Sequence, residues 1–214
     1  MRVRTWIMAL ALAACWGIVQ PPAASAAGRC GEPGNYFDGY YQNGRPEWRF
    51  TGASAYIVVR DGARCTGDNS LANFSNAWVM IAGSGIQDWG QVGFERSATS
   101  STAGSNLRWF SQFSSADGLA TRYSTSSVAS QVGVRHAFRV LYNPSCRCLQ
   151  ANIDGSTGWY TSPFDPKADW GGQPWSPQFM AEAGYLEADV PGRSTTRTSF
   201  NALGAQRLDN GAVV

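Results

Sequence analysis

The chain has 214 residues, of which 43% are hydrophobic and 15% are charged. This length supplies one ordinary hydrophobic core and is too short for two comfortable domains. Charged residues usually make up about a quarter of a globular chain, so the composition argues against a coiled coil, long exposed helices and charged disordered tails.

The N-terminus has the features of an export signal. Residues 1–4 are basic, residues 5–19 are largely apolar, and residues 24–26 are Ala-Ser-Ala, the small-residue pattern that precedes a signal-peptidase cut. We therefore predict a signal peptide over residues 1–26 and a secreted, extracellular chain whose residues 27–214 form a single domain.

A lipoprotein anchored at Cys15 is the alternative, because residues 12–15 resemble a bacterial lipobox. The residues that follow Cys15 are apolar, where a lipoprotein normally begins a polar tether. This favours secretion over anchoring, and both readings place the protein outside the cytoplasm.

The charge of the expected mature chain is balanced. Removing the two arginines of the signal from the 17 basic residues leaves 15, against 15 acidic residues. A neutral protein has no long-range field that would gather nucleic acid or an anionic membrane. We therefore expect neither a nucleic-acid partner nor, after signal cleavage, a membrane partner. We also expect a monomer.

Short segments rich in β-branched and aromatic residues recur along the rest of the chain, separated by Gly, Ser, Asn, Asp and Pro. The predicted strands are, in chain order, 48–50, 53–60, 77–82, 91–96, 108–113, 120–123, 136–142, 148–153, 158–161, 178–184 and 196–203. Many closely spaced strands, without a segment of helical period after the signal, predict an all-β fold. The expected architecture is a single antiparallel β-sandwich of jelly-roll or concanavalin-like type.

Four cysteines remain after the predicted cleavage: Cys30, Cys65, Cys146 and Cys148. An even number in an exported chain predicts two disulfides, with three connectivities to choose from. Two residues apart on an extended strand, Cys146 and Cys148 would have Cα atoms at the outer limit for a bridge. Either they have separate partners or a turn brings them together.

Several common catalytic sites are excluded. His136 is the only histidine, so a multi-histidine metal site is impossible, and the chain has neither a Gly-x-Ser-x-Gly elbow nor a glycine-rich phosphate loop. We expect no metal and no cofactor. Any catalysis or ligand binding would then depend on carboxylates, amides and aromatic rings on β-strands.

Two predicted strands combine an apolar face with a polar one. With a period of two residues, Trp89, Gln91 and Glu95 share one face of the first strand, and Gln178 and Glu182 share one face of the second. If both polar faces line one concave sheet, Gln91 and Glu182 can meet. The alternative is that both are solvent-side residues of a half-exposed sheet.

A pair of this kind is adequate for hydrolysis. A glutamate partly desolvated in a groove has a raised pKa and can act as a general base toward water. A nearby glutamine amide can help to fix that water and can donate to the developing oxyanion.

Five short motifs occur in a familiar order. They are Ala-Trp-Val-Met-Ile-Ala-Gly at 77–83, Gln-Val-Gly at 91–93, Arg-Trp-Phe-Ser at 108–111, Phe-Met-Ala-Glu at 179–182 and Thr-Ser-Phe-Asn-Ala at 198–202. Together they resemble the eqolisin family of glutamic peptidases, secreted enzymes with a concanavalin-like β-sandwich and a Gln/Glu dyad. Ser111 stands where that family carries a glutamate. Trp-Gly-Gly-Gln at 170–173 is more weakly similar to the neprosin peptidases.

The resemblance implies a secreted glutamic endopeptidase. Its catalytic residues would be Glu182, as general base, and Gln91, which would assist the water and the oxyanion. The expected substrate-binding residues are Trp89, Trp109, Glu95 and Gln178. The balanced charge argues against an optimum at very low pH, since acid would make the chain strongly cationic.

A non-catalytic secreted β-sandwich binding module is the alternative function. Aromatic rings on a concave sheet hold sugar faces as readily as peptide side chains, so the expected ligand is either a polypeptide or a polysaccharide. Trp78 is expected to be a core anchor, whereas Trp159, Trp170 and Trp175, on loops or edges, are expected to be exposed.

Overall fold

The computed structural model describes residues 30–41, 50–62, 64–65, 73–84, 87–97, 107–170, 175–185 and 198–207. The predicted signal peptide and the alternative anchor at Cys15 lie outside these residues. In the part that the structure describes, no helix is long and apolar enough to cross a membrane.

Strands dominate the described residues. They are β1 (Pro33–Tyr41), β2 (Phe50–Val58), β3 (Phe74–Ala82), β4 (Trp89–Ser97), β5 (Leu107–Ser115), β6 (Gly118–Tyr123), β7 (Arg135–Asn143), β8 (Cys148–Ile153), β9 (Ser156–Thr161), β10 (Ser176–Tyr185) and β11 (Phe200–Arg207). A 3-10 turn, η1 (Ala129–Gln131), precedes β7, and a short helix, α1 (Pro166–Asp169), precedes β10.

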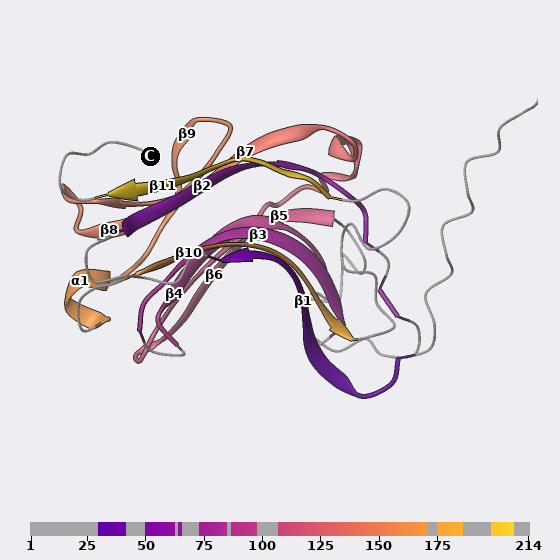
Figure 1. The fold of residues 1–214 in the computed structure, drawn as a ribbon, viewed down its shortest axis with the longest axis horizontal. Helices are drawn as coiled ribbons and strands as arrows, with labels where there is room; N and C mark the ends of the chain where they lie inside the picture. The colour runs from indigo at the N-terminus through magenta and orange to yellow at the C-terminus, as the bar shows by residue number, and fades with distance from the viewer. Residues whose placement is uncertain are drawn as a thin grey trace, which may run out of the picture.

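The strands form two stacked antiparallel sheets. One has the order β1-β10-β3-β4-β5-β6 and the other the order β11-β2-β7-β8-β9. Figure 1 shows that the six-stranded sheet arches, so that its outer face is concave and its convex face meets the other sheet. The predicted antiparallel β-sandwich of jelly-roll type is therefore confirmed.

The core lies between the sheets and follows the period of two residues that the sequence shows. On β7, Phe138 and Val140 are fully buried, and on the paired β8, Leu149 and Ala151 are fully buried. Each strand directs its alternate apolar side chains inward, as expected for a sheet with one covered face. The two strands form a hairpin.

Both disulfides form in the structure. Cys30 bridges to Cys65, and Cys146 bridges to Cys148 with a Cα–Cα distance of 5.2 Å. Arg147, between the last two, has a φ of 54°, so the chain turns there instead of extending. The turn is thus the correct alternative for this pair, and separate partners are wrong. Disulfides of this kind persist in oxidising compartments.

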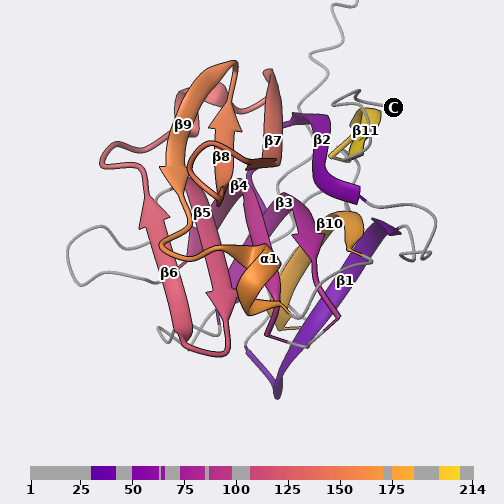
Figure 2. The same ribbon diagram turned by 90° about the vertical axis from the view of Figure 1, so that its left-hand side faces the viewer.

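Two tryptophans expected at the surface are in the core. Trp170 and Trp175 are 1% and 0% exposed, and their rings lie edge to face 5.2 Å apart. The Nε1 atom of Trp170 donates to the backbone carbonyl of Ser114 at 3.1 Å. The segment containing α1 folds over one end of the sandwich (Figures 1 and 2), which carries these rings inward and corrects the prediction of an exposed loop.

Candidate functional site

A groove of about 640 Å³ opens on the concave face of the six-stranded sheet. All six strands contribute to it. The lining residues are Asn35 and Phe37 from β1, Phe74, Asn76, Trp78 and Met80 from β3, Trp89, Gln91 and Glu95 from β4, Gln112 from β5, Tyr123 from β6, and Gln178, Met180 and Glu182 from β10.

The period of two residues explains which side chains reach the groove. On β3, Asn76, Trp78 and Met80 face the groove, whereas Ala77 and Val79 between them are buried in the core. The same alternation on β4 and β10 brings the two predicted polar faces to the same concave surface.

Two carboxyl groups flank an amide in one row across the sheet. Strand pairing sets Glu182 of β10 opposite Asn76 of β3, and Asn76 opposite Glu95 of β4. At about 4.8 Å between neighbouring strands, the two glutamate Cα atoms are roughly 10 Å apart. We call Glu182, Asn76 and Glu95 the carboxyl row.

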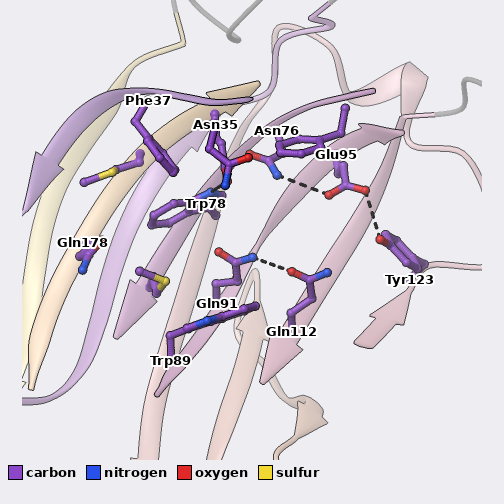
Figure 3. Close-up of a pocket in the computed structure, with 14 residues that line it drawn as sticks. Asn35, Phe37, Asn76, Trp78, Trp89, Gln91, Glu95, Gln112, Tyr123 and Gln178 are labelled. Carbon is purple, nitrogen blue, oxygen red and sulfur yellow. Dashed lines mark hydrogen bonds between the residues drawn. The ribbon is translucent and has the colours of Figure 1, made fainter. Parts of the chain in front are cut away.

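Hydrogen bonds hold both carboxyl groups. The Nδ2 atom of Asn76 donates to Oε2 of Glu95 at 3.4 Å, and the hydroxyl of Tyr123 donates to Oε1 of Glu95 at 3.1 Å (Figure 3). The Nε1 atom of Trp78 donates to Oε2 of Glu182 at 3.0 Å, and the Asn76 amide also hydrogen-bonds Glu182. The row is therefore a connected polar network on the groove floor.

Burial sets the charge of the pair. Glu182 and Glu95 are 9% and 6% exposed. Desolvation raises the pKa of Glu182 to about 7; the nearby charge of Glu95 adds to the rise, and the hydrogen bonds from Trp78 and Asn76 oppose it. Desolvation also raises the pKa of Glu95, against hydrogen bonds from Ser97, Asn76 and Tyr123. Both shifts favour the protonated acids, so near neutral pH the pair retains a proton.

A second row crosses the groove farther along the strands. Gln178 lies opposite Met80, Met80 opposite Gln91, and Gln91 opposite Gln112. The Nε2 atom of Gln91 donates to Oε1 of Gln112 at 2.7 Å (Figure 3). We call Gln178, Gln91 and Gln112 the amide row.

The structure places Gln91 and Glu182 in one groove but not in contact. Their partners on β3, Met80 and Asn76, are four residues apart, which is roughly 13 Å along an extended strand. Gln91 hydrogen-bonds Gln112, whereas Glu182 hydrogen-bonds Trp78. The expectation that the two side chains meet is therefore corrected: the faces match, but the register separates them.

Three of the four predicted substrate-binding residues lie in the groove, and one does not. Trp89, Glu95 and Gln178 line the groove, as their faces require. Trp109 does not: its ring packs between the sheets, edge-on to Phe138 at 5.4 Å and to His136 at 4.9 Å. Trp109 is three residues before Gln112 on β5, so the two point to opposite faces.

Several residues that line the site, Gln112 of the amide row among them, were not predicted from the sequence. Asn76 falls just before the predicted strand 77–82, so its face could not be assigned. Trp78, expected to be a core anchor, is only 2% exposed, but it faces the groove and donates to Glu182. The alternation of Asn76, Trp78 and Met80 was the available signal. No pattern in the sequence indicated that Tyr123, at the end of β6, would face the groove.

Among the described residues, no group of three or more His, Cys, Asp or Glu side chains is placed to hold a metal ion. His136 is away from the groove, and its Nδ1 atom lies 2.5 Å from a carboxylate oxygen of Asp154. The polar chemistry of the groove comes from carboxyl, amide, hydroxyl and indole groups.

Comparisons with known proteins show similarity in fold only. No protein-family model matches the chain, and no curated protein sequence matches it. SCP-B, an eqolisin peptidase solved in a complex with the tripeptide Ala-Ile-His, is 14% identical with a TM-score of 0.44, over 86% of this chain and 84% of that one.

Two glycoside hydrolases show a similar sequence identity to this chain, over a smaller part of it. A GH16 enzyme from Bacteroides ovatus, solved with its product, is 14% identical with a TM-score of 0.40, over 72% of this chain and 66% of that one. A glycoside hydrolase family protein from Mycobacterium thermorestibile is 15% identical with a TM-score of 0.41, over 77% of this chain and 61% of that one. The alignments thus span 61% and 66% of these two hydrolases.

Proposed function

We propose that the protein is a hydrolase that cleaves polypeptides bound in the concave groove, with Glu182 as general base and Glu95 as general acid. The observation that carries this proposal is the carboxyl row: two buried carboxyl groups on β10 and β4, joined by the Asn76 amide of the intervening β3 and facing one groove. Raised pKa values of both groups support it.

The reaction needs the pair to carry one proton. The carboxylate of Glu182 takes a proton from water, and the water oxygen attacks the carbonyl carbon of the bound peptide. Glu95 gives its proton to the amide nitrogen as the C–N bond breaks. Exchange with solvent then moves one proton from Glu182 off the enzyme and returns one to Glu95.

The groove chemistry favours a polypeptide over a polysaccharide. Side-chain amides of the amide row offer both donors and acceptors, as a peptide main chain requires. The flexible thioethers of Met80 and Met180 suit varied apolar side chains. Trp78 is too buried to offer its ring face to a sugar.

A polysaccharide ligand is the second candidate, and one observation favours it. Phe37, 54% exposed, and the half-buried Trp89 both line the groove and offer aromatic surface to a sugar ring. In that case the two carboxyl groups would act on a glycosidic bond or, in a binding module, on none. For either ligand we propose that the protein acts after export, which its disulfides support.

Cleavage of an unfolded, fluorescently labelled protein from pH 3 to pH 8 tests the proposal, with a soluble β-glucan assayed in parallel. Glu182→Gln and Glu95→Gln should each lower kcat by a factor on the order of 10² or more. Glu32→Gln, at an exposed position outside the groove, is the matched control and should behave like the wild type.

Circular dichroism should show that all variants fold. Peptide cleavage that survives both groove substitutions would refute the assignment of Glu182 and Glu95. Cleavage of the glucan alone would establish the second candidate. A folded wild-type protein that cleaves neither substrate would be a binding module.

A further inference from the structure

We infer that the amide row is a substrate subsite that binds the main chain of an extended polypeptide about four residues from the bond that is cut. This inference rests on the proposed function, because it takes the carboxyl row as the place of cleavage. It gives Gln91 a role in binding instead of catalysis.

The spacing of the two rows fits a peptide that runs along the strands. The rows are four residues apart on β3, from Asn76 to Met80, and both line the same groove. An extended peptide advances about 3.3 Å per residue, so four of its residues span the roughly 13 Å between the rows. A shorter peptide at the carboxyl row would not reach the amide row.

Gln91 and Gln112 together match one peptide unit. Their mutual hydrogen bond uses an Nε2 hydrogen of Gln91 and the Oε1 atom of Gln112. It leaves the Oε1 atom of Gln91 as an acceptor and the amide nitrogen of Gln112 as a donor, which are the two functions that a peptide N–H and C=O need. Gln112 is half-buried, so its amide is within reach of a ligand.

Among the described residues, no charged side chain lines the groove beside the amide row. Met80 lies between Gln178 and Gln91, and Trp89 lines the groove beside them. In the part of the chain that the structure describes, the carboxyl groups that line the groove are those of Glu95 and Glu182, both in the carboxyl row. The subsite therefore suits an uncharged stretch of polypeptide with an apolar side chain at this position.

A peptide series tests the inference. All members share one cleaved bond and are extended by one residue at a time, in separate series toward each end. For the wild type, kcat/KM should rise about tenfold at the length that first reaches the amide row, the effect of one or two hydrogen bonds. In Gln112→Ala, the ratio of kcat/KM between long and short peptides should fall to about one.

Two further variants keep the test decisive. Gln150→Ala changes a half-buried glutamine of β8, outside the groove, and should retain the wild-type dependence on length. Gln112→Asn keeps the amide but shortens its reach, and it serves if the alanine variant does not fold.

The outcomes separate this inference from the proposed function. Cleavage without any rise in kcat/KM as peptides lengthen, or a rise that persists in Gln112→Ala, would overturn the subsite while leaving the hydrolase intact. No cleavage of any peptide would refute the proposed function, and binding of long and short peptides by fluorescence polarisation would then decide the subsite. Preference for longer oligosaccharides instead of longer peptides would overturn the assignment of a polypeptide as the ligand of the amide row.

Discussion

Replacing Glu182 with glutamine is expected to stabilise the protein at neutral pH. The folded-state pKa of Glu182 is about 7, against 4.5 for an unperturbed side chain. Between these two values the folded chain keeps a proton that the unfolded chain has released. Stability therefore falls as the pH rises from 4.5 through 7, and no such loss exists below 4.5.

The magnitude follows from the two pKa values of Glu182. A difference from 4.5 to about 7 corresponds to about 3 kcal/mol, at roughly 1.4 kcal/mol per pKa unit. Glutamine has the shape of the protonated acid, and its oxygen can still accept from Trp78. Glu182→Gln should thus exceed the wild type by up to about 3 kcal/mol at pH 8 and match it near pH 4.

Urea unfolding followed by tryptophan fluorescence, at intervals from pH 4 to pH 8, measures this difference directly. Glu95 is present in both proteins, so the difference between them comes from the substitution at position 182, including its effect on Glu95. A variant that is no more stable than the wild type at pH 8, with the same dependence on pH, would refute the claim that Glu182 is a buried acid of raised pKa.

Four other changes should have distinct effects. Trp78→Phe removes a hydrogen bond that lowers the pKa of Glu182, so the pH profile of kcat/KM should move to higher pH by a measurable fraction of a unit. Replacing both cysteines of the Cys30–Cys65 bridge by serine should cost about 4 kcal/mol in urea unfolding, because the bridge spans 35 residues. The same change in the Cys146–Cys148 bridge, which spans 2 residues, should cost less than half as much. Trp170→Ala should lower stability by about 3–5 kcal/mol in thermal unfolding, since it empties a fully buried site.

The alternation of side chains along most strands could be predicted from the sequence, but the existence of β1 could not. Residues 33–41 contain two glycines, a proline and an aspartate, and most of their side chains are exposed. They form a strand because they pair with β10 at the edge of the sheet. The β-propensity of the residues themselves does not indicate that pairing.

Register was the missing information at the site. The period of two residues correctly placed Gln91 and Glu182 on groove-facing sides. A slip of two residues between strands preserves every face and changes every neighbour. Alternation alone therefore allows Gln91 to meet Glu182. The observed strand register instead brings Glu182 to Asn76 and Glu95.

The tryptophans show a related limit. Trp78 and Trp109 both lie in strands whose two faces contain large apolar or aromatic residues, so alternation alone does not say which face meets the core. Trp78 faces the groove and Trp109 faces the opposite sheet, the reverse of the expectation. Only the curvature and stacking of the sheets decide between the two faces.

The pH dependence of kcat/KM for a labelled peptide, measured for the wild type and Glu95→Gln, tests the carboxyl pair most directly. If one proton is shared between Glu182 and Glu95, the wild-type profile should be bell-shaped: activity is lost at low pH when both groups are protonated and at high pH when both are ionised. Glu95→Gln should lose most of its activity and the high-pH limb. A profile that keeps both limbs and full activity in Glu95→Gln would contradict the account.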